Sequence, residues 1–517
     1  MTDSYGVERS IAHINQLPNE LLVQLFLHYA EGAIPESKRH ASRTTNMRWL
    51  PLMLVCRYWR DVALASPSLW RVVRAAFKTS WTTLVLARSA TATIDFTFGV
   101  RGFSPVKTFK ALSPHVSRLQ SLRFIRIQDA WRPAALKFLC GAGDFPNLET
   151  LEFPVVSLVP GLEDTVANFT DIHISSQRFP CLRSLHLRLM IAPQDLSLCA
   201  KLQRLSLEWC LWGSSFDAFL DVLTSYTLLQ TFTLVASLQY LPGDWVKSST
   251  PRRPPIRLPS LTELSLREHP PAYTSGLLLH LFLPPTVSVV VSSVLVDESN
   301  TVHGIPDMLP PLHADGIPAL ASTTDVTVIQ AVGHKYSFQS VDNRAPTHPG
   351  VCLSIEGDIY TPVLTLSRAL GDLTRVFGSA PLRHLTIIGD CSDVEPDTWS
   401  SMFLSFPLLE SLRVVMSPNF INPVQELFLG LRNAVSGARP ACPKLDVIEM
   451  EGWAVDDEFV DALVDCLQCR SERGLALLKL EIHLTGFEGS LSEVVHALGM
   501  RLQGLVSEYS MRGTVVD

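Results

Sequence analysis

Two groups of side chains in this sequence have types and spacings that could support chemistry. Cys466 and Cys469 form a CxxC pair. A structural zinc site commonly needs a second ligand pair, and His483 alone does not supply one. Asp217 and Asp221 are four residues apart, so both carboxylates share one helix face, where such pairs are usually solvated. We therefore expect no metal and no cofactor.

Three motifs that commonly mark catalytic or phosphate-binding sites do not occur in the sequence. It contains no GxxxxGK[ST] phosphate loop, no GxSxG nucleophile turn and no HExxH zinc motif. The turn at residues 141–144 has two glycines but no phosphate-binding lysine. His186 and His384 lie between leucines of predicted strands, so we expect them to face solvent. A non-catalytic protein is favoured, and an enzyme is the residual alternative.

Composition indicates a folded chain with an extensive core. The 517 residues are 47% apolar and 18% charged, with a net charge of −7, which argues against a largely disordered chain. No dense stripe of lysine and arginine is present, so nucleic acid is not an expected partner. Ten cysteines are scattered too thinly for a disulfide scaffold and fit reduced thiols.

The sequence shows neither a secretion signal nor a membrane span. The first sixteen residues, MTDSYGVERSIAHINQ, lack an apolar core segment. The most apolar stretch, residues 276–296, is interrupted by His280 and by Pro284-Pro285, and each piece is shorter than the ~20 residues of a span. We read strands and a turn there, and expect a cytoplasmic or nuclear protein without a membrane partner.

A short cassette, L-x-x-L-x-(L/I/F/M/V), recurs after residue 110 and usually follows a proline. Its last L-x-L predicts a strand with alternate residues pointing inward, and its leading leucine predicts a core anchor. The copies occupy residues 118–124, 145–153, 179–187, 200–207, 227–234, 258–266, 381–387, 406–414, 442–450 and 477–482. Amphipathic helical segments between them include residues 216–223, 424–431 and 456–463. This alternation predicts a right-handed β-α solenoid.

The repeat register is poor between residues 267 and 380. Strand-like runs persist at residues 287–291, 325–330 and 351–356, so we expect degenerate repeats to bridge the gap. Two proline-rich loops, residues 241–259 and 304–318, interrupt the array. Such loops either project and carry recognition or lack order, and the sequence leaves both alternatives open.

The first seventy residues predict a separate helical unit. Pro18 suits a first helical position, and an apolar face follows it (Leu21, Leu22, Leu25, Phe26 and Tyr29). Residues 31–48 are polar and predict a loop. A second helical face then comprises Leu52, Val55, Cys56, Trp59, Val62 and Ala63, and Pro67 forms a turn that delivers Leu69 and Trp70.

These residues resemble the F-box family. The runs LPNELLVQLFLHYA and WLPLMLVCRYWRDVALASPSLWRVV contain its opening Leu-Pro, a hydrophobic helix, Val-Cys-x-x-Trp and a closing Pro-x-Leu-Trp. With the repeats, the chain is similar to F-box proteins with leucine-rich repeats from mushroom-forming (basidiomycete) fungi. The resemblance implies a small α-helical F-box module followed by an irregular β-α leucine-rich-repeat solenoid, which is an α/β fold. It implies a substrate-recognition adaptor that docks a Skp-family adaptor, joins a cullin-based ubiquitin ligase and holds an unknown target protein.

Carried over residue by residue, the resemblance makes one set of residues the adaptor-docking and F-box core set: Leu17, Pro18, Leu21, Leu22, Val55, Cys56, Trp59, Leu69 and Trp70. Each could instead be only core, and Trp59 is expected in the core. The strand surface could contact a target through Arg183, His186, Gln203, Ser206, Glu208, Arg383 and His384, although ordinary solvent-exposed surface is the favoured interpretation of these residues.

Two features depart from the family pattern. The segment 31–48 is longer than the usual connection, and the Asn/Cys position after a repeat strand is filled by Cys210 after Leu207 and hardly elsewhere. The alternative is a repeat scaffold whose F-box-like hairpin only caps the solenoid. The expected organisation is a tail (1–13), the helical module (14–75), a linker or capping segment (76–110) and the repeats (111–517).

Overall fold

The computed structural model divides into two compact units, Met1–Gly213 and Ser214–Asp517. It describes residues 17–32, 49–74, 79–99, 105–125, 131–153, 172–243, 245, 253–295, 303–311, 316–331, 334–341, 349–357, 364–416, 425–437, 440–453, 457–487 and 498–515. The predicted tail and most of the predicted 31–48 insertion lie outside the described residues.

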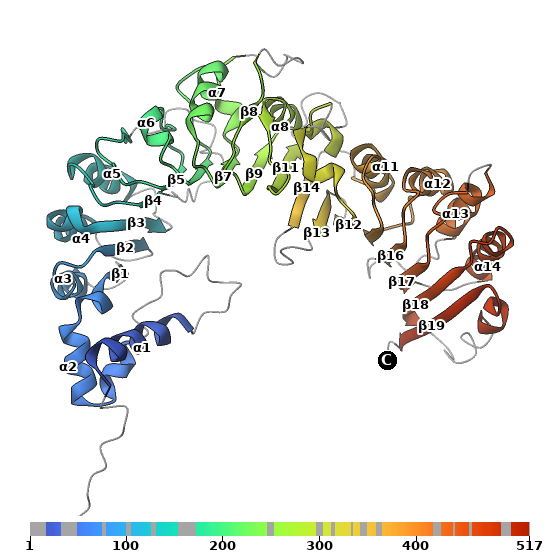
Figure 1. The fold of residues 1–517 in the computed structure, drawn as a ribbon, viewed down its shortest axis with the longest axis horizontal. Coiled ribbons are helices and arrows are strands. Elements are labelled where there is room, and N and C mark those ends of the chain that lie inside the picture. Colours follow the sequence, from blue (N-terminus) through green and yellow to red (C-terminus); the bar gives the residue numbers. More distant parts are fainter. Residues whose placement is uncertain are drawn as a thin grey trace, which may run out of the picture. The chain divides into compact units, whose positions relative to one another are not determined.

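The first unit begins with short helices and continues into a parallel sheet (Figure 1). The helical region comprises α1 (Asn19–Gly32), η3 (Leu50–Leu54), α2 (Arg57–Ala65) and η4 (Pro67–Trp70). The strands are β1 (Val72–Arg74), β2 (Ile94–Gly99), β3 (Leu119–Ile125), β4 (Thr150–Phe153), β5 (Ser184–Arg188) and β6 (Arg204–Glu208). Each strand pairs in parallel with the next in the chain. The sheet therefore starts at β1, directly after the helical region.

The helices of the first unit connect its parallel strands and lie along one face of the sheet (Figure 1). They are α3 (Thr79–Arg88), α4 (Pro105–Leu112), η5 (Ser113–Arg118), α5 (Arg132–Gly141) and α6 (Leu196–Cys199). Parallel neighbours need crossover connections, which these helices provide. The other face of this sheet, called the strand face below, carries the outward residues of β1 to β6.

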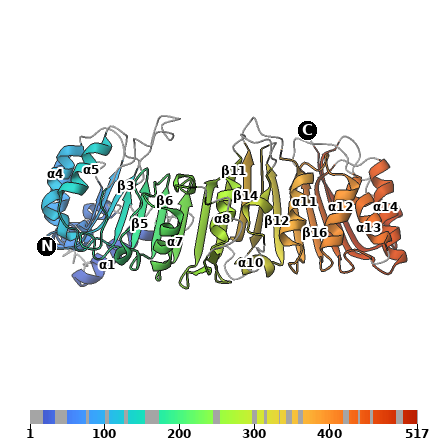
Figure 2. The same ribbon diagram turned by 90° about the horizontal axis from the view of Figure 1, so that it is seen from above.

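The second unit is also a mostly parallel sheet with helices along one face (Figures 1 and 2). Its main strands are β7 (Thr231–Val235), β9 (Glu263–His269), β11 (Ser288–Leu295), β12 (Asp325–Ala331), β13 (Lys335–Val341), β14 (Pro349–Gly357), β15 (His384–Gly389), β16 (Ser411–Met416), β17 (Val447–Trp453), β18 (Leu477–Phe487) and β19 (Val506–Val515). A small parallel pair joins β8 (Ile256–Arg257) to β10 (Leu281–Phe282).

The second unit begins with a helix, and its other helical elements lie between these strands in the chain. The helical elements are α7 (Phe216–Ser225), η9 (Leu238–Tyr240), α8 (Pro271–Leu278), η11 (Ile305–Met308), α10 (Pro318–Ala321), α11 (Leu366–Phe377), α12 (Pro396–Ser405), α13 (Glu426–Ser436) and α14 (Asp457–Glu472). The predicted helices at 216–223, 424–431 and 456–463 correspond to α7, α13 and α14. Each helix begins within two residues of its predicted start, but α14 continues to Glu472, well beyond its predicted end.

Strand order departs from chain order in the middle of the second unit. Strand β11 pairs with β14, which pairs with β13, then β12, then β15. The three predicted strand-like runs are present as β11, β12 and β14. Strand β13, however, is antiparallel to both its neighbours. A hairpin-connected block reverses the order here, because sequential antiparallel strands need only short connections.

The recurring cassette forms the core as its pattern predicts. Every cassette leads into a strand, and the leading leucines are buried, including Leu148, Leu182, Leu202, Leu409 and Leu445. Inward residues then align across neighbouring strands. Leu122 pairs with Leu151, Leu151 with Leu185 and Leu185 with Leu205, all of them buried. One continuous apolar layer results under the helices of each unit.

The described parts of the proline-rich segments pack against their neighbours. In the second segment Ile305, Met308 and Leu309 are buried. In the first, Trp245 stacks on Phe216, with ring centroids 4.0 Å apart. The apolar side chains of these described residues fill gaps beside the helices.

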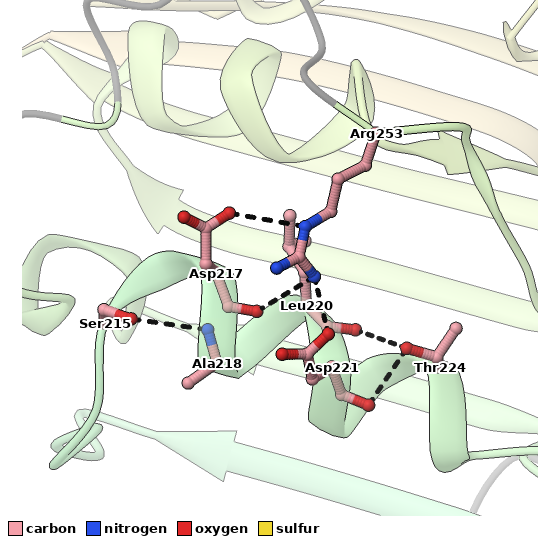
Figure 3. A network of polar contacts seen from close by, with 7 residues as sticks. All are labelled: Ser215, Asp217, Ala218, Leu220, Asp221, Thr224 and Arg253. Carbon is pink, nitrogen blue, oxygen red and sulfur yellow. Dashed lines mark hydrogen bonds and ion pairs between the residues drawn. The ribbon is translucent and has the colours of Figure 1, made fainter.

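A second contact anchors the first proline-rich segment. Arg253 lies over α7, with its Nη1 2.6 Å from Asp221 Oδ1 and its Nε 3.5 Å from Asp217 Oδ1 (Figure 3). Helix α7 starts where Ser215 caps it, accepting a hydrogen bond from the Ala218 N–H. The Asp217/Asp221 pair is therefore not only solvated, because one arginine bridges both carboxylates.

Among the described residues, no helix is long and apolar enough to cross a membrane. In the same part of the chain, no group of three or more histidine, cysteine or acidic side chains is arranged to hold a metal ion.

Candidate functional site

Helix α1 has a wider apolar face than its packing uses. Leu22, Phe26 and Ala30 form a stripe at intervals of four residues and are fully buried. Leu21 and Tyr29 belong to the same apolar sequence pattern but are exposed, Leu21 to 48%. The helix therefore buries one stripe inside the protein and leaves apolar side chains outside it.

The second helical segment is split, which the sequence did not predict. The chain forms the 3-10 helix η3, then breaks at Val55 and Cys56 before α2. Cys56 adopts an extended conformation and caps α2, its Sγ accepting a hydrogen bond from the Trp59 N–H at 3.5 Å. The break turns Leu54 and Val55 outward, and they are 78% and 59% exposed.

The hydroxyl group of Tyr58 connects this break to the start of α1. It lies 3.0 Å from the Leu17 carbonyl oxygen and 3.0 Å from Asn19 Oδ1. These contacts join the start of α1 to the start of α2, and both segments carry exposed apolar side chains. We call this region the module surface, and it consists of Pro18, Leu21, Leu54, Val55 and Tyr58. Exposed apolar side chains that occur together in one small domain commonly mark protein–protein contacts.

Below the module surface lies an aromatic core. Trp59 packs on Phe26 with ring centroids 5.3 Å apart. Trp70 packs edge-on against Trp49 at 5.1 Å, and its indole N–H donates to the Ala63 carbonyl at 2.8 Å. The Arg88 guanidinium, from α3, lies 5.0 Å from the Trp70 ring centroid. The helical region is thus packed directly onto the start of the sheet.

The predicted docking set separates into three groups. Pro18, Leu21 and Val55 are exposed, and Leu17 and Cys56 are half-buried. Leu22, Trp59, Leu69 and Trp70 are buried and belong to the core. Leu54 and Tyr58 were missed by sequence reasoning. The sequence did contain a signal for the helix break. A residue that caps one helix cannot also continue the helix before it, so a cap at Cys56 implies a break there.

Some of the predicted target-binding residues come together on the strand face of the first unit. His186 and Ser206 are register partners on β5 and β6, and His186 Nε2 lies 2.8 Å from Glu208 Oε1. Arg188 lies 3.8 Å from Glu208 Oε2. Arg183 and Gln203 lie just before these strands, Arg183 exposed and Gln203 half-buried.

Arg383 and His384 belong to the second unit. Arg383 Nη1 lies 2.7 Å from Glu410 Oε1, and His384 is exposed at the start of β15. Further charges pair along β16 to β18. Arg413 bonds to Glu451 at 2.8 Å, and Lys479 bonds to Glu481 at 2.6 Å. The hydrogen bond between Lys479 and Glu481 raises the pKa of the lysine and lowers the pKa of the glutamate.

Comparison with known protein families gives a match that covers the helical region and the start of the sheet. Residues 14–75 match the F-box-like family. The F-box-like domain thus contains the module surface, the aromatic core and strand β1. It supports a general F-box-type adaptor role, since F-box domains generally bind Skp-type adaptors in SCF complexes. No match was found among the curated proteins.

Proposed function

We propose that this protein is the substrate-recognition adaptor of an SCF-type E3 ubiquitin ligase. The F-box-like domain docks a Skp-family adaptor and, through it, a cullin-based ligase. The strands and helices that follow act as leucine-rich-repeat units of a solenoid and hold a target protein. The chain itself is non-catalytic in this proposal, ubiquitin transfer belongs to partner subunits, and the protein acts in the cytoplasm or the nucleus.

The module surface is the observation that carries the docking proposal. Leu54 and Val55 are highly exposed, although many other apolar side chains of the same domain are buried. Their exposure follows from the helix break that Cys56 caps, so the local structure holds them outward. Burying such side chains against a partner removes apolar area from water and favours association.

Co-expression with a Skp-family adaptor followed by affinity capture tests the proposal. The informative variant is Leu54→Ser/Val55→Ser, because both side chains are exposed and their loss leaves the aromatic core intact. The matched control is Leu404→Ser, an exposed leucine on α12 at 56% exposure. We expect capture by the wild type and the control, and at least a tenfold loss for the double variant. A folded wild type that captures no Skp-family adaptor contradicts the proposal.

A second candidate is a scaffold in which the F-box-like domain only caps the sheet. The packing of Trp70 against Trp49 and Arg88, and the pairing of β1 with β2, favour it. Because β1 lies within residues 14–75, deleting the domain would strip a strand and perturb either kind of protein. The Leu54→Ser/Val55→Ser variant separates the two candidates more cleanly, because a domain that only caps the sheet does not need exposed Leu54 and Val55 side chains.

A further inference from the structure

A polar pocket of about 230 Å³ opens on the strand face of the first unit, where strands β1 to β4 begin. Its lining includes Arg71, Gln120, Arg123, Glu149 and Thr150. The lining is rich in groups that donate or accept hydrogen bonds and contains no aromatic side chain. None of the residues predicted from sequence to bind a target belongs to it.

A β-bulge in strand β3 shapes this pocket. Ile94 pairs with Leu119 and Asp95 pairs with Ser121, so Gln120 has no partner on β2. The Gln120 side chain is held in place, because its Oε1 accepts hydrogen bonds from Arg71 Nη2 and from Thr93 Oγ1, both at 3.2 Å. Bulges of this kind redirect side chains and are common beside binding sites.

The charged side chains of the pocket are not all paired with one another. Arg71 is neutralised by Asp95, with Nη2 2.8 Å from Oδ2, and Arg123 by Glu152, with Nε 3.2 Å from Oε1. Glu149 remains, half-buried in the lining. Within the described part of the chain, its carboxylate forms no ion pair and no side-chain hydrogen bond. Because Arg123 pairs with Glu152, which lies outside the lining, Glu149 is the lining carboxylate that has no cationic partner among the described residues.

Comparison with Glu410, in the second unit, explains why Glu149 has no ion-pair partner among the residues that the structure describes. The two glutamates occupy the same cassette position, in FPNLETLEF and FPLLESLRV. The Glu410 N–H donates to the Arg383 carbonyl, and the Arg383 side chain also reaches the Glu410 carboxylate at 2.7 Å. The Glu149 N–H donates to the Gln120 carbonyl instead. A neutral carboxamide, already engaged by Arg71, stands where the other repeat has a cation.

We propose that this pocket binds a basic side chain, arginine or lysine, of the target polypeptide. The inference rests on the proposed function for the existence of a target. Glu149 supplies the opposite charge, and the Ser121 and Thr150 hydroxyls can accept the remaining N–H groups. An acidic or phosphorylated side chain does not fit, because both arginines of the pocket are already paired and Glu149 would repel it.

Peptide binding to the full-length protein tests this pocket. The probes are fluorescein-labelled pentapeptides Gly-Ser-X-Ser-Gly with arginine, lysine, glutamine or glutamate at X, followed by fluorescence anisotropy. We expect the arginine and lysine probes to bind best. Glu149→Gln should weaken their binding roughly tenfold, the usual loss for one charged hydrogen bond. Glu410→Gln is the matched control and should leave binding unchanged.

A charge reversal provides an independent measure. Glu149→Arg should reverse the preference, so that the glutamate probe binds better than the arginine probe. Thermal unfolding of each variant checks the fold. Equal binding of the basic and neutral probes to the wild type, no binding of any probe, or an unchanged Kd in Glu149→Gln overturns the proposal. Adaptor capture is measured separately, so a failure of the ligase proposal with intact peptide binding is recognisable, and so is the converse.

Discussion

The F-box-like domain and the strand face both cover an apolar core, but the side chains that they expose to solvent differ in kind. The module surface exposes leucine, valine, proline and tyrosine side chains. The strand face of the first unit exposes polar side chains in contact with one another, such as Arg71 with Asp95 and His186 with Glu208. Apolar contact suits one constant partner, whereas placed charges discriminate among partners. The difference teaches that one chain presents two chemically distinct surfaces.

The largest expected effect separates the core of the F-box-like domain from its surface. Trp59→Ala should lower the free energy of unfolding by about 3–5 kcal/mol, because the indole is 5% exposed and packs on Phe26. Leu54→Ala, its matched surface control, should change the same quantity by less than about 0.5 kcal/mol. Urea unfolding followed by circular dichroism measures both. Similar losses in the two variants would remove the distinction between core and module surface.

A polar group inside the core behaves differently from those on the strand face. His269 is fully buried, and desolvation lowers its pKa to about 3. Its Nδ1 accepts from the Leu238 N–H at 3.5 Å, and its Nε2 lies 3.3 Å from the Leu234 carbonyl oxygen, so the ring fits as a neutral donor–acceptor bridge.

The sign of the resulting pH dependence follows from this lowered pKa. Between about pH 6.5 and pH 3 the unfolded chain protonates His269 and the folded protein does not. Stability is therefore present above pH 6.5 and falls by about 1.4 kcal/mol per pH unit as pH decreases. His269→Gln should show a slope smaller by this amount in urea unfolding between pH 6.5 and roughly pH 4.5. Identical slopes would mean that the histidine titrates normally in the folded protein.

Much of the architecture was predictable because its signals are local. The proline-led cassettes placed their strands and their buried leading leucines, such as Leu148 and Leu409. The reversed block β12–β14 was not predictable, since alternating strands read the same whichever neighbour they pair with. Pairing partners are set by contacts between residues distant in sequence.

The binding surfaces were only partly predictable for a related reason. Apolar spacing cannot tell Leu22, which is buried, from Leu21, which is exposed, because both lie on the broad apolar face of one helix. The pocket around Glu149 depends on the bulge at Gln120 and on which glutamates form an ion pair with an arginine. Those features arise from strand register, and the sequence motif is nearly the same at Glu149 and Glu410.

The helix cap at Cys56 offers a smaller test of the F-box-like domain. A thiol is a weak acceptor, and the Trp59 N–H lies 3.5 Å from it. Cys56→Ser supplies a better capping oxygen and should stabilise the domain by about 0.5–1 kcal/mol without covering Leu54 or Val55. Thermal unfolding measures the gain, and adaptor capture should stay unchanged. Loss of capture with a raised Tm would show that the thiol itself contacts the partner.

The smallest expected effect concerns the charged face of the second-unit sheet. Arg413 is half exposed and reaches Glu451 at 2.8 Å. Its replacement in Arg413→Gln should change the free energy of unfolding by less than about 0.5 kcal/mol, and less still at high salt, because solvent screens exposed pairs. Urea unfolding at low and high salt measures this. A large, salt-insensitive loss would mean that these charges hold the sheet together. A negligible loss would mean that stability does not depend on these charges, so they remain available to contact a partner. The buried aromatic core of the F-box-like domain, whose loss is costly, has no such freedom.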